Sequence, residues 1–441
     1  METHDLEPGN VGTLINDHVK ELLDCLQRSE DNDPNRFLPS IVEIPDSLRV
    51  LSEKSFSPRE VHIGLLHHNT ESKMLKERYL IKLLSRIPFP IPKEDILNSC
   101  MRKVYDSMEK IFKCYGYVQM MTYDYNEFAE MVVMDACFIL EFCNKISEYD
   151  ESFRGNMVLD RTIIYDLVLL ENQIPFFILD HIFQCTILKF KPTTTLLECI
   201  RPLLNLLNLF QENIKTDNIP ITDDDHILSV LYKCYKPQHY VKPASLTSPI
   251  HSAADLDKAG VNFKPARNPK WLLGMDVKLN RFSCCFSWWC CLPTLSMPVL
   301  YVHDFTELVL RNLIAYEQQS SQTDRYIISY ACAMDMLVNT QEDVAKLIDS
   351  KVLINSMGSY EEAAKMINSI CKEVSWEHSF YGEQLRMLNE YPNSCCQKNI
   401  AELRNTYCRS PLTLIALLVG IIVFVLTVVQ TIYTIRSTGN N

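Results

Sequence analysis

Residues 159–183 read LDRTIIYDLVLLENQIPFFILDHIF, an almost unbroken apolar run in which acids such as Asp166 and Glu171 are embedded. Residues 130–142, EMVVMDACFILEF, have the same character. Both runs carry too much charge to cross a membrane, and both are too apolar all round for a surface helix. They predict helices at the centre of a buried core. Pro175 should kink or restart the helix in the first run, because proline lacks an N–H and clashes with the preceding turn.

The composition is that of a globular and mainly helical protein. The chain has 441 residues, of which 47% are hydrophobic and 22% are charged, and these values are ordinary for a folded domain. Only 11 residues are glycine, which disfavours glycine-rich phosphate loops and many-stranded sheets. The net charge of −12 argues against binding to nucleic acid. We therefore predict a mainly α fold, with one large helical domain that includes minor short strands.

The apolar pattern along the chain predicts the order of its parts. The expected parts are a flexible N-terminal segment (1–40), a helical domain (41–390), a juxtamembrane linker (391–410), a transmembrane helix (411–435) and a tail (436–441). Inside the domain, helical spacing is found at 96–117, at 195–211 and from 304 onward, and short strands are expected within 261–284. Ser252 is placed to cap a short helix over 254–260.

The C-terminal run of the sequence indicates a membrane anchor. Residues 411–435 read PLTLIALLVGIIVFVLTVVQTIYTI, and no charged residue lies between Arg409 and Arg436. A helix rises about 1.5 Å per residue, so roughly 20 apolar residues cross a bilayer core that is about 30 Å thick. We predict a single-pass protein of the plasma membrane or an endomembrane, held by its C-terminal helix.

Several patterns favour a cytosolic position for the main domain. Lys398, Arg404 and Arg409 precede the apolar run and only Arg436 follows it, as the positive-inside rule requires of a cytosolic N-terminal side. The N-terminus shows no secretory leader. The 17 cysteines are scattered, and no Asn-X-Ser/Thr acceptor for glycosylation occurs. The opposite orientation stays open as an alternative.

Four acids inside the two apolar runs are the first candidates for a functional site. They are Asp135, Glu141, Asp166 and Glu171. A buried carboxylate costs several kcal/mol unless it is paired or hydrogen-bonded. The functional interpretation is a paired-acid or metal site between two helices. The structural interpretation, which we favour, is that the acids bind backbone groups or pair with Arg161 and Arg311. No Glu-x-x-His occurs in the chain, so a di-iron site has no support.

Cysteine and histidine clusters give weaker signals. A group of adjacent cysteines lies in CCFSWWCC, and its members are Cys284, Cys285, Cys290 and Cys291. Their spacing fits a zinc site poorly and favours a hydrophobic loop, with S-acylation as an alternative. His62, His67 and His68 favour an exposed turn over a metal cluster. No known catalytic motif is present, so we predict no catalytic residue, no cofactor and no metal.

Several strings of the chain resemble a plant family known as domain of unknown function 247. The strings are VHIG with His67-His68 at 61–68, MVVMDACFILEF at 131–142, DLVLLENQIPFFIL at 166–179 and RNLIAYEQ at 311–318. The first three are similar to the family's SIGPYHHG, LDGCFILEL and DLLLLENQLPFFVL elements, and RNLIAYEQ is nearly the full family string. The resemblance extends over roughly 41–435. The sequence departs from the family at Leu65-Leu66, Asn69 and Ala136. The first changes put a shared role of the 62–69 turn in doubt, and the others are conservative.

The resemblance implies a helical domain with a C-terminal membrane anchor and no established catalytic activity. Some grass members are linked to self-incompatibility, so it also implies recognition of a protein partner, with small secreted proteins as one class. We predict a recognition or signalling protein, and the alternative is an enzyme with an uncatalogued carboxylate site. The polar residues of the family strings would form a buried structural network. Its expected members are Asp135, Glu141, Asp166, Glu171, Asn172, Gln173, Arg311, Asn312 and Glu317.

Overall fold

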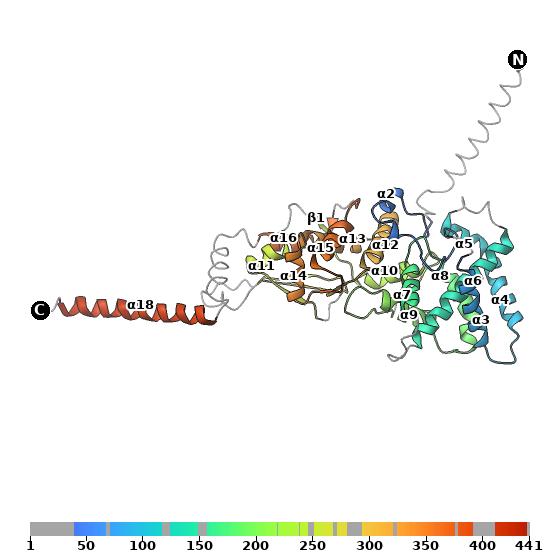
Figure 1. Cartoon of the computed structure of the whole chain (residues 1–441), viewed down its shortest axis with the longest axis horizontal. Helices are drawn as coiled ribbons and strands as arrows, with labels where there is room; N and C mark the ends of the chain where they lie inside the picture. The colour runs from blue at the N-terminus through green and yellow to red at the C-terminus, as the bar shows by residue number, and fades with distance from the viewer. Residues whose placement is uncertain are drawn as a thin grey trace, which may run out of the picture. The chain divides into compact units, whose positions relative to one another are not determined.

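The chain folds mainly into helices, with a few short strands (Figure 1). The structure, a computed structural model, describes residues 39–67, 71–116, 124–148, 157–217, 219–237, 239–245, 251–267, 271–279, 293–320, 324–374, 378–390 and 411–438. This confirms the predicted mainly α class. The N-terminal segment before residue 39, the linker at 391–410 and the CCFSWWCC cysteines lie outside the described residues.

The chain divides into two compact units. Unit 1 comprises Met1–Leu207, Ile214–Cys234 and Arg311–Asp324, and unit 2 comprises Asn208–Asn213, Tyr235–Leu310 and Arg325–Asn441. The division falls inside helix α12 (Thr306–Gln319), between Leu310 and Arg311.

Unit 1 is built around one long helix, α6 (Tyr125–Ser147), which packs against α3, α4, α8 and α9 (Figure 1). The other helices of this unit are α2 (Asp46–Arg49), η1 (Glu53–Ser55), α3 (Lys73–Ser85), α4 (Lys93–Asp106), α5 (Met108–Tyr115), α7 (Met157–Asp166), α8 (Phe176–Cys185), η3 (Ile187–Lys189), α9 (Leu196–Leu207) and nearly all of α10 (Ile227–Tyr235). The predicted core helix at 130–142 is thereby confirmed, and it is longer at both ends.

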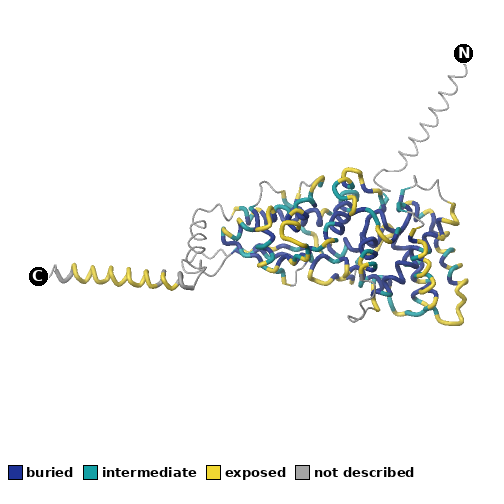
Figure 2. The backbone as a smooth tube through the Cα atoms, in the orientation of Figure 1, coloured by how far each residue is buried: buried dark blue, intermediate teal, exposed yellow. Residues whose placement is uncertain are grey.

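Helix α6 begins where Asp124 caps it and is buried along most of its length. The Asp124 side chain accepts a hydrogen bond from the backbone N–H of Asn126 at 2.7 Å, which satisfies one of the free donors at the helix start. Phe138 and Phe142 stack on each other inside the core, with ring centroids 5.9 Å apart. Figure 2 shows the buried helices of unit 1 as dark blue segments. The polar side chains of Asp135, Glu141 and Asn144 on α6 therefore lie where water cannot solvate them.

Unit 2 combines short helices with small sheets. Its elements are β1 (Ala244–Ser245), α11 (Ala253–Lys258), β2 (Asn262–Pro265), β3 (Asp276–Lys278), β4 (Thr294–Met297), β5 (Leu300–Val302), α13 (Tyr326–Leu337), α14 (Gln341–Asp349), β6 (Leu353–Asn355), α15 (Tyr360–Ile370), β7 (His378–Ser379), α16 (Gly382–Glu390) and α18 (Pro411–Thr438). Strand β4 pairs in parallel with β2 and antiparallel with β3, β5 pairs in parallel with β6, and β1 pairs antiparallel with β7. The predicted Ser252 cap is confirmed, since its side chain accepts a hydrogen bond from the N–H of Asp255.

Helix α18 contains the C-terminal apolar run. Its described side chains are those of residues 415–416 and 419–435, and all of them are exposed (Figure 2). Within the residues that the structure describes, no helix meets the combined length and hydropathy required of a membrane span.

The structure corrects the expected helices in two places. The run at 159–183 is interrupted before Pro175 is reached, because residues 167–175 form a non-helical connector between α7 and α8. The predicted restart at Pro175 is confirmed, since α8 begins directly after it. The run at 96–117 is divided at Ser107 into α4 and α5. The first interruption arises because the side chains of the connector bind its own backbone, which periodicity does not reveal.

Candidate functional site

The side chain of Asn172 holds the connector, residues 167–175, against the N-terminal part of unit 1. Its Nδ2 donates to the carbonyl oxygens of Val61 and Asp166, both at 2.9 Å. Its Oδ1 accepts a hydrogen bond from the backbone N–H of Ile63 at 2.6 Å. One amide therefore satisfies three backbone groups that would otherwise be buried without partners.

Gln173 fixes the shape of the connector from within. Its Nε2 donates to the carbonyl oxygens of Leu167 and Leu169 at 2.9 and 2.8 Å, and its Oε1 accepts from the N–H of Leu228 at 3.3 Å. The Tyr115 hydroxyl donates to the Gln173 carbonyl oxygen at 2.5 Å. The side-chain amide and the carbonyl oxygen of Gln173 are therefore all engaged by the protein itself.

Asp166, the last residue of α7, binds the backbone of the segment 59–61. Its carboxylate accepts hydrogen bonds from the N–H groups of Arg59 at 3.0 Å, Glu60 at 2.8 Å and Val61 at 3.0 Å. Burial nevertheless raises the pKa of Asp166, because loss of water outweighs these three bonds. The carboxylate acts as an acceptor for a turn of backbone that has no helix or sheet partner.

Glu171 is buried and has three partners. Its Oε1 accepts from the N–H of Ile44 at 2.6 Å and from the guanidinium of Arg49, and its Oε2 lies 2.9 Å from Nε2 of His67. Burial opposes ionisation, but the hydrogen bonds from His67, Arg49 and Ile44 outweigh it, so the pKa of Glu171 is lowered. His67 is half-buried, so this imidazole–carboxylate pair reaches the surface on the histidine side.

Asp135, on α6, binds the same N-terminal part of unit 1. Its Oδ2 accepts from the N–H of Gly64 at 2.8 Å, and its Oδ1 lies 2.5 Å from Nζ of Lys76 on α3. Gly64 has φ +72°, a left-handed conformation that favours glycine. Asp135, Asp166 and Glu171 therefore all bind donors of one segment, residues 41–67. Each of the three carboxylates binds a different set of these donors.

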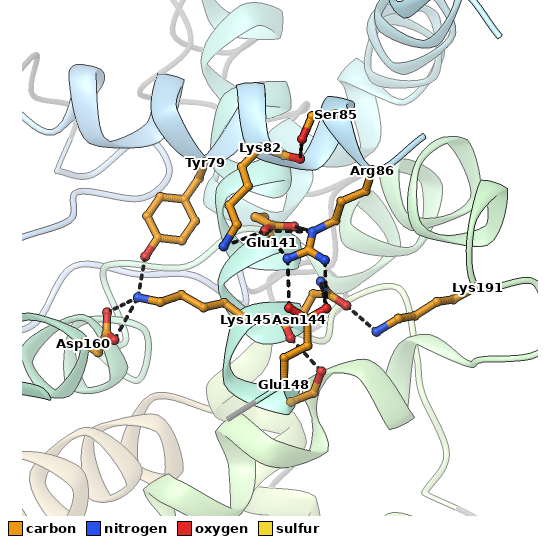
Figure 3. Close-up of polar contacts among 11 residues, drawn as sticks. Tyr79, Lys82, Ser85, Arg86, Glu141, Asn144, Lys145, Glu148, Asp160 and Lys191 are labelled. Atoms are coloured by element: carbon orange, nitrogen blue, oxygen red, sulfur yellow. Dashed lines mark hydrogen bonds and ion pairs between the residues drawn. The ribbon is translucent and has the colours of Figure 1, made fainter. Parts of the chain in front are cut away.

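Glu141 belongs to a second cluster, which joins α6 to the end of α3 (Figure 3). It is fully buried, and its carboxylate accepts from Nε and Nη2 of Arg86 at 3.0 Å, with Nζ of Lys82 at 3.4 Å. Arg86 also pairs with Glu148 at 2.8 and 3.0 Å. Burial opposes ionisation of Glu148, but the hydrogen bonds and charge of Arg86 lower its pKa. The Arg86 guanidinium thus binds two carboxylates, that of Glu141 on α6 and that of Glu148 at the C-cap of the same helix.

The same cluster extends along α6 through Asn144 and Lys145 (Figure 3). Lys145 donates to both carboxylate oxygens of Asp160 on α7, at 2.6 and 2.8 Å, and to the hydroxyl of Tyr79 on α3 at 3.2 Å. Lys191 donates to Oδ1 of Asn144 at 2.6 Å. These contacts tie three helices together through charges at the edge of the core.

The remaining predicted members come from α12. Asn312 is fully buried, and its Oδ1 accepts from the N–H of Leu170 at 2.8 Å while its Nδ2 donates to the carbonyl oxygen of Ser55 at 2.6 Å. Arg311 and Glu317 are also buried. Asn312 therefore links the connector to the η1 turn.

The chemistry available to these groups is limited by their partners. The His67–Glu171 pair has the geometry that orients an imidazole as a general base, although Arg49 and Ile44 share the same carboxylate. Across the described ranges, no group of three or more His, Cys, Asp or Glu side chains is arranged to hold a metal ion.

Glu171 should make the stability of unit 1 depend on pH. Because its folded-state pKa lies below the ordinary value of 4.5, its contribution is present above that value and is lost as the pH falls through the folded-state pKa. A Glu171→Gln variant should therefore unfold at a lower urea midpoint than the wild type at pH 7, and the gap should narrow by pH 3. A gap in the urea midpoint that stays constant from pH 7 to pH 3 would contradict the lowered pKa of Glu171. His67→Ala is the control, because it leaves the hydrogen bonds from Arg49 and Ile44 to Glu171 in place.

A family model described as a plant protein of unknown function, DUF247, matches residues 41–426. The chain belongs to this family. It is similar to two curated proteins of Arabidopsis thaliana. The UPF0481 protein At3g47200 is 26% identical over 440 residues, which cover 91% of this chain and 87% of the relative. The putative UPF0481 protein At3g02645 is 21% identical over 515 residues, which cover 94% and 93%. No solved structure matches the chain.

Several members of the site in this DUF247 chain were not predicted from its sequence. Arg49, Lys76 and Arg86 provide the cations for Glu171, Asp135 and Glu141. They lie in polar stretches whose charges look solvated, so spacing along the chain carries no signal for these pairs. The only available signal was that each buried acid requires some partner.

Proposed function

We propose that this DUF247 chain is a membrane-anchored recognition protein without an enzymatic activity of its own. Residues 41–390 present a surface to a protein partner, and residues 411–435 hold that surface at a bilayer. The observation that supports the proposal is the engagement of Asp135, Asp166 and Glu171 by cations and backbone N–H groups of their own fold.

That engagement bears on function because a catalytic acid or base needs an atom that faces the substrate. Asp166 uses both carboxylate oxygens on three backbone donors, and Asp135 uses one oxygen on Gly64 and the other on Lys76. Such side chains stabilise a turn, and this explains why the chain keeps acids inside apolar runs. The enzyme alternative draws on one contact, the pair between half-buried His67 and Glu171.

The anchor rests on the C-terminal sequence. Helix α18 has 28 residues, and at about 1.5 Å per residue it exceeds the roughly 30 Å thickness of a bilayer core. Residues 419–435 expose aliphatic side chains such as Ile421 and Leu426, which are 52% and 61% exposed. A row of such side chains in water is unfavourable by about 25 cal/mol per Å² of apolar surface, so a lipid environment would stabilise it.

Expression of the full chain in plant cells should place it in the membrane fraction, and alkaline carbonate should not extract it. A double variant, Ile421→Arg with Val425→Arg, should move the protein to the carbonate-soluble fraction, because each charge at the centre of a span costs about 2.5–3.5 kcal/mol. The matched control is Thr427→Val, which keeps the run apolar. Retention of the double-arginine variant in the carbonate pellet would contradict the anchor. Digestion of an N-terminal tag in sealed vesicles would show the cytosolic orientation that we expect.

Proximity labelling in intact tissue tests the recognition function. A labelling enzyme on the full chain should mark proteins that the same enzyme on residues 391–441 alone does not mark, because residues 41–390 provide the partner surface. Identical labelled sets would overturn the proposal. A cytosolic domain predicts intracellular partners, and an outward-facing domain predicts small secreted ones. The enzyme alternative would be favoured if the wild type formed a reaction product that folded variants at Glu171 and at His67 did not form.

A further inference from the structure

The turn between α3 and α4 is apolar and extends beyond the core of unit 1. Its residues 87–92 read IPFPIP and contain no polar side chain. The last buried residue of α3 is Leu84, the first of α4 is Ile96, and no residue between them is buried. Turns usually carry Gly, Asn, Asp or Ser, because these residues suit both a tight backbone and water. We call residues 87–92 the apolar tip.

Phe89 is the most exposed large apolar side chain among the residues that the structure describes, with 97% of its surface accessible. Ile91 is 37% exposed, and the three prolines of the tip are exposed as well (yellow in Figure 2). A single exposed apolar residue is ordinary on a protein surface. A continuous run of five, from 88 to 92, indicates a surface that another molecule or phase covers.

The conformation of the apolar tip is restricted before any binding takes place. Proline fixes φ near −65°, so three of the six residues have little backbone freedom to lose. At the base of the tip, the Arg86 guanidinium binds Glu141 and Glu148 and holds the end of α3 against α6. A preorganised side chain binds with a smaller loss of conformational entropy than a mobile one. Phe89 is therefore presented at low entropic cost.

The backbone of the tip has few hydrogen-bond donors. Pro88, Pro90 and Pro92 have no N–H, and the N–H of Ile91 donates to the carbonyl oxygen of Pro88 at 3.4 Å. Within 88–92 only Phe89 contributes a further N–H. Irregular backbone is ordinarily excluded from lipid because its polar groups find no partners there. This turn meets that condition better than an ordinary one.

The charges beside the tip balance one another. The exposed neighbours are the cations Lys82 and Lys93 and the anions Glu94 and Asp95. Attraction to anionic headgroups therefore contributes little, and burial of apolar surface is the remaining driving force. Phe89 stands clear of other side chains, whereas the centre of a protein interface is surrounded by a rim that excludes water. A fluid hydrocarbon layer can surround such a side chain on all sides.

We propose that the apolar tip inserts Phe89 and Ile91 into the acyl-chain layer of a bilayer, as a second membrane contact of this chain. The inference rests on the proposed membrane anchor, because a small apolar tip binds weakly unless residues 411–435 keep it near the bilayer. Only these two side chains enter the apolar layer. The tip thereby holds unit 1 at the membrane surface.

The test uses the full-length protein in vesicles of phosphatidylcholine, with either ordinary or brominated acyl chains. Phe89→Trp places a fluorescent probe on the tip, and the wild type, with its four tryptophans, gives the background. Val50→Trp is the matched control, because Val50 is 86% exposed in the same unit. Its neighbours in the chain include Arg49, Glu53 and Lys54. Bromine should quench the added fluorescence of Phe89→Trp about threefold more than that of Val50→Trp, and high salt should leave this difference unchanged.

Further variants test the role of the Phe89 side chain itself. In Ile91→Trp the added probe should be quenched as strongly as in Phe89→Trp. Adding Phe89→Asp to Ile91→Trp should abolish the quenching, because a charge on the tip opposes entry into hydrocarbon. Adding Val50→Asp to Ile91→Trp should leave the quenching unchanged. Circular dichroism of each variant checks that it is folded.

Two kinds of result separate the tip from the anchor. If carbonate leaves the protein in the vesicles and Phe89→Trp is quenched no more than Val50→Trp, the tip does not insert, the anchor stands, and a protein pocket becomes the occupant to seek. A difference that high salt removes would also overturn insertion, since it would assign the contact to headgroup charge. Extraction of the wild type by carbonate would overturn the anchor and, with it, the insertion of the tip.

Discussion

A Gly64→Ala substitution is expected to destabilise unit 1 by about 3 kcal/mol or more, which is the sum of a left-handed backbone penalty and an overpacking penalty. Gly64 has φ +72°, which an alanine adopts only with strain. A Cβ at this position would also overlap the carbonyl oxygen of Gln173 and lie 2.5 Å from the hydroxyl of Tyr115. The Gln173 carbonyl belongs to backbone that cannot yield without breaking the connector.

Gly116→Ala is the matched control for this experiment. Gly116 has a similar φ of +78°, but among the residues that the structure describes its added Cβ would meet only Pro39, with Cγ at 3.6 Å, which is ordinary van der Waals contact. We expect its loss to be limited to the backbone penalty of about 1–3 kcal/mol, because φ +78° with ψ 137° is a conformation that glycine adopts far more readily than alanine. Urea titrations of both variants and of the wild type measure the two losses in the free energy of unfolding, which are then compared. Equal losses at the two glycines would show that the close approach of Gly64 to Gln173 is not a constraint.

Arg86→Ala should cost about 3–5 kcal/mol, because it removes the guanidinium that bonds to the fully buried carboxylate of Glu141. Lys82 remains at 3.4 Å, but it is a half-exposed lysine with one contact and cannot replace a two-nitrogen contact. Urea titration of the variant and the wild type at pH 7 measures the difference.

Glu148→Ala provides the comparison, since it removes the exposed partner of the same guanidinium. An exposed pair of this kind contributes about 0–1 kcal/mol, so we expect a small loss. The double variant Arg86→Met with Glu141→Met should recover much of the stability, because replacing both buried charges removes the cost of desolvation. If Arg86→Ala and Glu148→Ala had equal effects, the buried pair would not stabilise the association of α3 with α6.

The sequence predicted the helical core well where a long apolar run was the dominant signal. The apolar residues around Asp135 and Glu141 indicated a central helix, and α6 is that helix. The same reasoning failed for the connector at 167–175, because Asn172 and Gln173 bind the backbone there and replace the hydrogen bonds of a helix. Periodicity records which side chains are apolar, and it does not record which backbone groups a polar side chain will satisfy.

The candidate site shows the same division. The sequence by itself determined that acids such as Asp166 and Glu171 would be buried, and burial required that each have a partner. Only the tertiary structure decided that Asp166 binds backbone N–H groups at 59–61 and that Glu171 binds Arg49 and His67. These partners lie more than a hundred positions away in the chain. Apolar patterning acts on neighbours along one helix, whereas the choice of a polar partner depends on which segments the folded core brings together.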